Sequence, residues 1–268
     1  MDLIQPIFVN ENQTEESPLG ENNKLYNISD IHDRIKKDID LGINKFLLFC
    51  VPLEKDTDPK WQWQGEVVHE IKNKHDINLH VDICLCSTMP DGHCNVTDDP
   101  KKTEQLLQEQ ASVVSVAGAD VLAPSDCQPN TVVNMKQYID KPVMSYSAKF
   151  RSVFYHGWRD AVNIDAGIVR DYQLNPRESN EAIERCIKYA NDGADYMMVK
   201  PGMPSLDLIY PIQRATGLPT GVYQTSGEYM GLPRAPGSLL ETYYIFKRAG
   251  ADYMITYGAR DLTGEINE

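Results

Sequence analysis

The sequence has few cysteines and a deficit of basic residues, and each shortage excludes a class of protein. Six cysteines in 268 residues are too few for a disulfide scaffold, and this number fits a reducing compartment. The 26 Lys and Arg residues are outnumbered by 39 Asp and Glu residues, so the formal net charge is -13. Most of such a surface would repel nucleic acid or an anionic membrane. We therefore expect no nucleic-acid partner.

Long hydrophobic runs are also absent. No stretch approaches the length of a membrane-spanning helix, and the first residues, MDLIQPIFVN, lack the basic region and long apolar core of a signal peptide. These absences predict a cytoplasmic protein that does not bind membranes. The length suits one α/β barrel at least as well as two smaller domains. Because no linker or low-complexity segment interrupts the chain, we expect residues 1–268 to form a single domain.

A tripeptide motif, Gly-Ala-Asp, recurs in the sequence. Gly-Ala-Asp stands before an apolar run at 118–120, 193–195 and 250–252, where it predicts the end of a helix followed by a strand. Further apolar runs at 3–9, 41–51, 79–85, 141–147 and 218–224 bring the number of predicted strands to eight. Apolar residues at helical spacing predict helices between the strands, for example at 99–117 and 176–192.

Eight strands that alternate with helices favour a (β/α)8 barrel, the TIM barrel, built on a parallel sheet. An open, doubly wound sheet is the alternative, and it calls for a glycine-rich phosphate loop after the first strand. The segment 7–20, IFVNENQTEESPLG, is not such a loop. We therefore predict a barrel whose chemistry lies at the C-terminal ends of its strands.

Two neighbouring predicted strands end in a lysine. Lys200 closes the run YMMVK, and Lys149 closes VMSYSAK on the strand before it. A single lysine at a strand end is usually only solvated. Two amines in one barrel mouth raise the cost of protonating each other, so one or both can be neutral near pH 7. Because a neutral amine attacks carbonyl groups, the pair predicts Schiff-base chemistry.

Three of the cysteines lie close together in the segment DICLCSTMPDGHC. Cys84 and Cys86 are separated by one residue, so on a strand both thiols point to one face, and Cys94 follows a Pro-Asp-Gly turn. Three thiolates can hold a zinc ion and leave its fourth position to water or substrate. The alternative is that the three serve only as small buried or loop residues.

Seven motifs occur in order over nearly the whole chain: DICLC with GHC, APSD, MSYSAKF, FYHGWRDA, YQLNP, MMVKPG and YQTSGEY. In this set the chain resembles the porphobilinogen synthases, also called δ-aminolevulinic acid dehydratases. The resemblance implies a lyase of heme biosynthesis that condenses two 5-aminolevulinate molecules, with loss of two waters, to porphobilinogen. Lys200 would form a Schiff base with one substrate molecule and Lys149 with the other. The alternative is a divergent paralogue, either an imine-forming barrel enzyme with another substrate or a non-catalytic binder.

The resemblance also implies roles for other residues. Zinc on Cys84, Cys86 and Cys94 would help to orient and deprotonate the second substrate molecule. The expected partners for protons or for the substrate amine are Asp82, Ser125 and Asp126. The expected substrate-binding residues are Arg159, Arg170 and Gln173 for one carboxylate, on a lid at about 150–173, Ser226 and Tyr257 for the other, and the aromatic residues Tyr155 and Tyr223.

Several features depart from the family pattern. Val169 stands where a lid arginine is expected, so either Arg170 replaces it by a shift of one residue or the second clamp is missing. Pro129 replaces an acidic residue, and Gly258 replaces an aromatic one. The chain begins at its first predicted strand, without the family's N-terminal arm, so we expect a dimer or monomer rather than an octamer.

Overall fold

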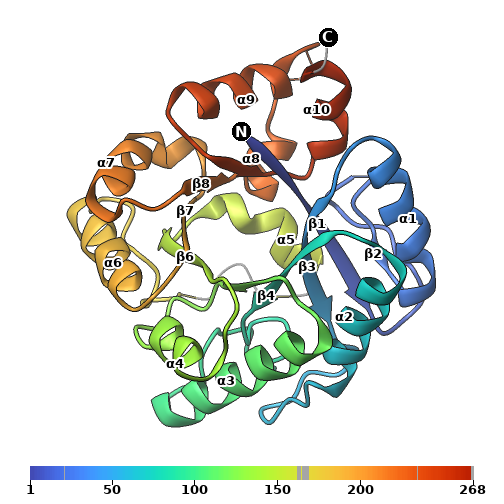
Figure 1. The fold of residues 1–268 in the computed structure, drawn as a ribbon, viewed down its shortest axis with the longest axis vertical. Helices are drawn as coiled ribbons and strands as arrows, with labels where there is room; N and C mark the ends of the chain where they lie inside the picture. The colour runs from blue at the N-terminus through green and yellow to red at the C-terminus, as the bar shows by residue number, and fades with distance from the viewer. Residues whose placement is uncertain (21, 162–163, 165–168, 234, 267–268) are drawn as a thin grey trace.

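The computed structural model describes residues 1–20, 22–161, 164, 169–233 and 235–266. Within them, eight parallel strands form the barrel: β1 (Asp2–Asn10), β3 (Lys45–Val51), β4 (Asn78–Ile83), β5 (Val121–Pro124), β6 (Met144–Lys149), β7 (Tyr196–Lys200), β8 (Thr220–Tyr223) and β9 (Tyr253–Ile255). They pair in the order β5-β4-β3-β1-β9-β8-β7-β6, and the short β2 (Leu25–Tyr26) pairs with β1 outside this order. A parallel bridge between Leu122 and Val143 brings the two ends of the order together. The result is the predicted TIM barrel (Figure 1), so the doubly wound alternative is wrong.

The helices surround this ring of strands. Those in the described residues are α1 (Ile28–Asp40), α2 (Gln62–Lys74), α3 (Pro100–Ala117), α4 (Thr131–Tyr138), α5 (His156–Ala161), α6 (Asn180–Asn191), α7 (Leu206–Thr216), α8 (Ser226–Met230), α9 (Ser238–Arg248) and α10 (Ala259–Ile266). In Figure 1 most of them lie around the outside, whereas α5 crosses the opening of the barrel. The segment that carries α5 is therefore placed over the ends of the strands.

The two helices predicted in detail both form. The one predicted at 99–117 is α3, whose first N–H groups are capped by Asp99: its side chain accepts a hydrogen bond from the Lys102 amide. The one predicted at 176–192 is α6, which begins only at Asn180. The start is later because Asn175 first makes a turn, in which its side chain and its carbonyl accept hydrogen bonds from the amides of residues 177 and 178.

The Gly-Ala-Asp motifs end helices and start strands, as predicted. Their glycines have the positive φ angles of a helix C-terminus, 113° at Gly118, 101° at Gly193 and 98° at Gly250. Their aspartates then fix the start of the barrel strands. The Asp195 carboxylate accepts a hydrogen bond from the Val143 amide at 2.8 Å and pairs with Lys136 at 3.0 Å. Asp120 and Asp252 likewise accept hydrogen bonds from backbone amides at the start of neighbouring strands.

Apolar side chains form two layers, one on each side of the strands. Along β1, Ile7 and Val9 pack in the layer between strands and helices, whereas Phe8 packs in the barrel interior. The interior layer is rich in rings: Phe8, Phe49, Tyr146, Tyr223, Tyr253 and Tyr257. The floor beneath the C-terminal ends of the strands is therefore largely aromatic.

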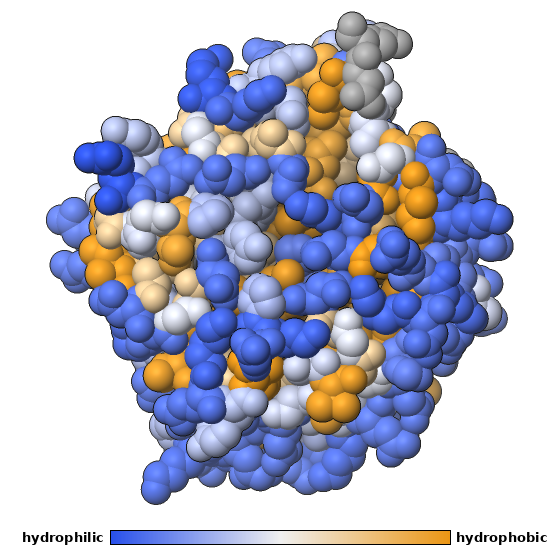
Figure 2. All heavy atoms as spheres, viewed as in Figure 1, coloured by the Kyte–Doolittle hydropathy of each residue, from blue (hydrophilic) through white to orange (hydrophobic). Residues whose placement is uncertain are grey.

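The molecular surface is mainly polar. On the face shown in Figure 2, hydrophilic residues predominate and hydrophobic ones lie in separate patches. Among the described residues, none of the helices combines the length and apolar character needed to span a membrane.

Candidate active site

Two lysine amines lie on adjacent strands at the C-terminal end of the barrel. Lys149 ends β6, Lys200 ends β7, and the two residues face each other in the register of the strands. Both are buried, with 7% and 8% of their surface exposed. The Lys149 Nζ donates a hydrogen bond to the carbonyl of Ser125 at 2.5 Å. The structure thus brings together the two amines that the sequence singles out.

The two amines differ in charge. Burial, followed by the positive charge of Lys149, lowers the pKa of Lys200 to about 7. Burial also opposes protonation of Lys149, but interactions with the cysteines around it, among them Cys94 with its lowered pKa, outweigh burial and raise the pKa of Lys149 above its ordinary value. Lys200 is therefore the amine available as a neutral nucleophile near pH 7, while Lys149 carries a proton.

Tyrosine rings surround the Lys200 amine. Its Nζ lies 3.8 Å from the ring centre of Tyr223, 5.0 Å from that of Tyr146 and 5.3 Å from that of Tyr155. The Tyr155 hydroxyl donates hydrogen bonds to the carbonyls of Phe150 at 2.5 Å and Lys200 at 3.1 Å, which fastens the ends of β6 and β7. These rings keep water from the amine, and this burial is the main reason for its low pKa.

A carboxylate from β4 lines the same cavity as the two amines. The Oδ1 atom of Asp82 is buried and has no hydrogen-bond partner among the described residues. Burial raises the pKa of Asp82 to about 7, although a hydrogen bond with Ser125 and the two lysine charges oppose this shift. Asp82 can therefore gain or lose a proton near neutral pH.

Ser125 and Asp126, which were predicted to act together with Asp82, differ in their position relative to the cavity. Ser125 lines the cavity, whereas Asp126 is not among its described lining residues. The Oδ2 atom of Asp126 accepts hydrogen bonds from the Gln128 amide at 2.9 Å and the Thr131 hydroxyl at 2.5 Å. These bonds hold the start of α4, and the role of Asp126 in proton transfer stays a prediction.

The three predicted cysteine ligands form a cluster. The sulfur atoms of Cys84, Cys86 and Cys94 lie within 4.8 Å of one another. The expectation that the first two lie on a strand was wrong: β4 ends at Ile83. The chain turns directly after it, because the carbonyl of Leu85 accepts hydrogen bonds from the amides of residues 88 and 89. Hydrogen bonds from Cys84 and Cys86 hold the pKa of the Cys94 thiol well below its usual range.

This donor set fits a metal ion. Cys86 and Cys94 line the cavity that contains the lysines, so a metal held by the cluster has a side open to a bound molecule. The Cys94 amide donates a hydrogen bond to the Tyr172 hydroxyl at 2.9 Å, which fixes the third ligand. His93 instead places its ring against the edge of the Tyr172 ring. Three sulfur ligands with one open position are typical of soft metal sites that bind substrate.

Basic and amide groups of the predicted lid reach the cavity. Arg159, Arg170 and Gln173 all line it. Arg170 is 3% exposed and donates a hydrogen bond to the Gly92 carbonyl at 2.8 Å, whereas Val169 is 65% exposed. The arginine that stands one position after Val169 in the sequence, Arg170, is therefore the one that is buried at the cavity. The buried Oε1 atom of Gln173 has no partner among the described residues. Part of the predicted lid, 162–163 and 165–168, lies outside those residues.

Ser226 and Tyr257, which were predicted for the second carboxylate, and Tyr223, which was predicted as a substrate-binding aromatic residue, are absent from the described lining of the lysine cavity. The Ser226 hydroxyl accepts a hydrogen bond from the Trp158 amide at 3.0 Å, and the hydroxyls of Tyr223 and Tyr257 lie 3.3 Å apart. The predicted roles of these residues in substrate binding stay predictions.

Comparison with known proteins identifies the family. The family model described as delta-aminolevulinic acid dehydratase matches residues 1–264. The chain belongs to the δ-aminolevulinic acid dehydratase family. The enzyme of that name from Halalkalibacterium halodurans is 32% identical over 295 residues, which cover 100% of this chain and 90% of the relative. The one from Methanothermus sociabilis is 34% identical over 292 residues, which cover 99% and 91%.

Solved structures agree with this assignment. The δ-aminolevulinic acid dehydratase from Toxoplasma gondii, in complex with the reaction product porphobilinogen, matches with a TM-score of 0.92 and 28% identity, over 98% of this chain and 84% of that one. A structure described as an aldolase matches with a TM-score of 0.54 at 14% identity and shares the fold alone. The resemblance found in the sequence is confirmed: this is a member of the δ-aminolevulinic acid dehydratase family, whose reaction condenses two 5-aminolevulinate molecules to porphobilinogen.

Gly258 and Pro129 are two positions at which this chain departs from the δ-aminolevulinic acid dehydratase pattern outside the lid. A Cβ atom on Gly258 would lie 2.5 Å from a Leu239 methyl group and 2.8 Å from the Tyr229 ring, so these two side chains occupy the space that a side chain at position 258 would need. Pro129 is not among the described lining residues of the cavity that holds Lys149 and Lys200, and its carbonyl accepts a hydrogen bond from Lys188 at 2.7 Å.

Sequence reasoning missed Tyr146, whose ring lies close to both amines. Strict alternation along a strand puts residues 146 and 149 on opposite faces. The pairing of β6 with β7 shifts between Ser145 and Ala148, and this irregularity turns Tyr146 and Lys149 to the same side. The printed sequence carries no reliable signal for such a shift.

Proposed function

We propose that this chain condenses two 5-aminolevulinate molecules to porphobilinogen through Schiff bases on its two lysines. The observation that carries the proposal is the lowered pKa of Lys200 beside Lys149. The neutral Lys200 amine attacks the ketone of the first substrate and expels water, which gives an imine. The protonated imine makes the adjacent carbon more acidic and the imine carbon more electrophilic.

The second substrate molecule binds on the side of the cysteine cluster. Lys149 forms the second imine after it has given up its proton, and Asp82, with a pKa of about 7, is the nearby group suited to accept protons. The metal that Cys84, Cys86 and Cys94 would hold is zinc, because three sulfur ligands suit this ion. When bound there, zinc supplies a Lewis acid next to the second substrate.

Arg159, Arg170 and Gln173 bind a substrate carboxylate. Two guanidinium groups and an unpartnered amide oxygen in one cavity suit a molecule with a carboxylate at one end and an amine at the other. The cavity measures only about 40 Å³, enough for a few water molecules but not for one substrate. Segment 150–173 therefore acts as a lid that moves away to admit substrate and closes over it.

The remaining parts of the proposal concern the chain as a whole. Residues 1–268 act as one barrel domain, and the enzyme works in the cytoplasm. The single-domain proposal is supported by the pairing of β1 with β9, which joins strands from near the two ends of the described chain in one sheet.

Incubation of the protein with 5-aminolevulinate and zinc, followed by a colour assay for the pyrrole, tests the proposal. We expect porphobilinogen from the unaltered chain, none from Lys200→Met, and an unchanged rate from Lys101→Met, which alters an exposed lysine of α3. A pyrrole yield that Lys200→Met leaves unchanged, or no pyrrole from a folded and zinc-loaded protein, would contradict it.

A further inference from the structure

Residues 170–174, which include the end of the lid, form a short strap against the cysteine cluster. The Arg170 guanidinium donates a hydrogen bond to the Gly92 carbonyl at 2.8 Å, and the Tyr172 hydroxyl accepts one from the Cys94 amide at 2.9 Å. The Tyr172 ring also meets the imidazole between these two residues edge to face, with ring centres 6.2 Å apart. Two residues of the strap therefore hold three successive residues of the loop that carries the third cysteine.

The base of the strap is fixed to the barrel. Leu174 is fully buried, its amide donates a hydrogen bond to the Lys149 carbonyl at 3.0 Å, and its carbonyl accepts one from the Arg151 amide at 2.9 Å. On the other side, the Arg185 guanidinium of α6 donates a hydrogen bond to the Tyr172 carbonyl at 2.9 Å. The strap therefore leads from the strand end that carries one of the two amines to the cysteine cluster.

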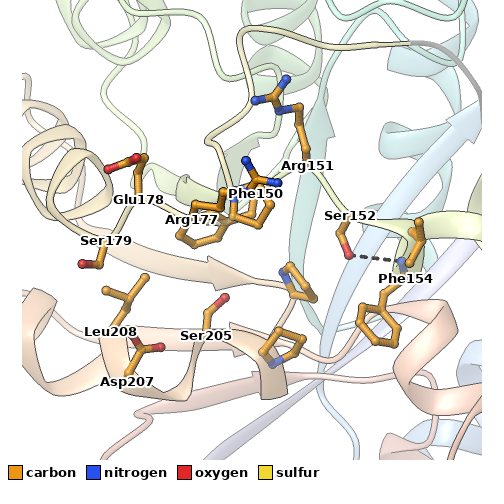
Figure 3. Close-up of a pocket in the computed structure, with 14 residues that line it drawn as sticks. Phe150, Arg151, Ser152, Phe154, Arg177, Glu178, Ser179, Ser205, Asp207 and Leu208 are labelled. Carbon is orange, nitrogen blue, oxygen red and sulfur yellow. Dashed lines mark hydrogen bonds between the residues drawn. The ribbon is translucent and has the colours of Figure 1, made fainter.

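A cavity of about 550 Å³ lies beside the base of the strap (Figure 3). Phe150 and Arg151, which follow β6, line it together with Arg177 and Glu178, which follow the strap. None of residues 170–174 is among its described lining. The polar side chains of the strap therefore serve the smaller cavity that contains the lysines.

Two of these side chains reach the lysine cavity. Arg170 and Gln173 both line it, and the Gln173 amide donates a hydrogen bond to the Arg170 carbonyl at 3.0 Å, which closes a tight turn. Tyr172 belongs to the same turn and holds Cys94. One turn of the chain thus joins two residues proposed to bind the substrate carboxylate to one residue proposed to bind the metal.

A lid that opens breaks the contacts between the strap and loop 92–94, and a lid that closes forms them again. Cys94 loses most of its freedom when it ligates a metal together with Cys84 and Cys86, so the loop is then ordered before the strap returns and closure costs less free energy. We infer that Tyr172 is a positioning residue that couples the metal site to the lid. Its hydroxyl aligns Cys94 for the metal, and a ligated Cys94 in turn holds the lid closed over the substrate. The inference rests on the proposed function for its metal and its substrate.

Zinc affinity, measured without substrate by competition with a chromophoric chelator, tests the alignment of Cys94. Tyr172→Phe keeps the ring and removes only the hydroxyl, and it should weaken zinc binding about ten-fold, as expected for loss of a hydrogen-bonding partner of a metal ligand. Tyr138→Phe, which alters an exposed tyrosine at the end of α4, is the matched control and should leave zinc binding unchanged. Circular dichroism checks the fold of each variant. Equal zinc affinity in Tyr172→Phe and the unaltered chain would overturn the role of the hydroxyl.

Levulinate tests the coupling to the lid. It has the ketone and the carboxylate of the substrate but offers no amine to a metal. Calorimetric titration at saturating zinc and in the presence of a chelator should show that zinc tightens levulinate binding to the unaltered chain about five-fold and to Tyr172→Phe much less. Without zinc the two chains should bind levulinate equally. Equal tightening by zinc in both chains, or a variant that is weakened equally with and without zinc, would overturn the coupling.

The unaltered chain separates this inference from the proposed function. Absence of zinc binding, or no levulinate adduct on Lys200 after reduction with borohydride, would contradict the proposed function and the inference with it. If the unaltered chain shows both, and Tyr172→Phe matches it in zinc affinity and in the effect of zinc on levulinate binding, the inference alone is wrong.

Discussion

Replacing Lys149 by methionine should raise the pKa of Lys200. The positive charge of Lys149 is the second cause, after burial, of the low pKa of Lys200. The two Nζ atoms lie 5.7 Å and 5.0 Å from the centre of the same Tyr146 ring, so by adding these distances they are at most about 11 Å apart. At an effective dielectric constant of about 20, two charges at that distance repel by about 1.5 kcal/mol, which is about one pKa unit.

A higher pKa of Lys200 should slow imine formation near neutral pH, because a smaller fraction of its amines is then neutral. The amine attacks only without its proton, so imine formation falls as the pH drops through the pKa. With a pKa of about 7, half of the Lys200 amines are neutral at pH 7. With a pKa raised to about 8, about one tenth would be neutral. Lys149→Met should therefore slow imine formation at Lys200 about five-fold at pH 7 and hardly at all at pH 9.

Trapping with cyanoborohydride in the presence of 5-aminolevulinate, followed by mass spectrometry, measures this rate between pH 5 and pH 9. The unaltered chain should reach half of its maximal rate near pH 7, and Lys149→Met about one unit higher. Lys101→Met is the matched control, and circular dichroism checks the fold of each variant. The same midpoint for Lys149→Met and the unaltered chain would refute the electrostatic coupling of the two lysines.

Two further predictions concern the metal and the substrate carboxylate. The zinc-loaded protein should contain about one zinc per chain by atomic absorption, and Cys94→Ala should lose both the zinc and the activity. The control variant Cys186→Ala, which alters a buried cysteine on α6, should keep both. Full activity without metal would contradict the cysteine site. Arg159→Gln should raise KM for 5-aminolevulinate by roughly ten-fold with a smaller change in kcat, because the variant lacks a charged group that contacts the bound substrate. A change confined to kcat would argue against a role of Arg159 in binding the substrate carboxylate.

The sequence was sufficient for the barrel because its signals are local and repeated. Gly-Ala-Asp at three of the connections from a helix to a strand, as at Gly193 and Asp195, marks where the helix ends and the strand begins. The two lysines could be placed for the same reason, since each ends a run of apolar residues. Asp82, by contrast, was predicted from the resemblance to the family, and it lies on β4.

Features that depend on contacts between distant segments could not be predicted from pattern alone. Arg170 turns inward because the carbonyl of Gly92, far away in sequence, accepts its hydrogen bond, and the sequence left open whether this arginine or none served as the clamp. Ser226 is held by the backbone of the segment around α5. Tyr146 reaches the amines only through a shift in strand register. Such arrangements follow from tertiary packing, which spacing in the sequence does not encode.

The most direct test of the account is the position of the covalent bond to substrate. The protein is treated with 5-aminolevulinate and borohydride, digested, and its peptides are mapped by mass spectrometry. The account predicts a reduced adduct on the peptide that contains Lys200, and loss of that adduct in Lys200→Met. An adduct confined to exposed lysines, or no adduct in a folded protein, would contradict the Schiff-base mechanism.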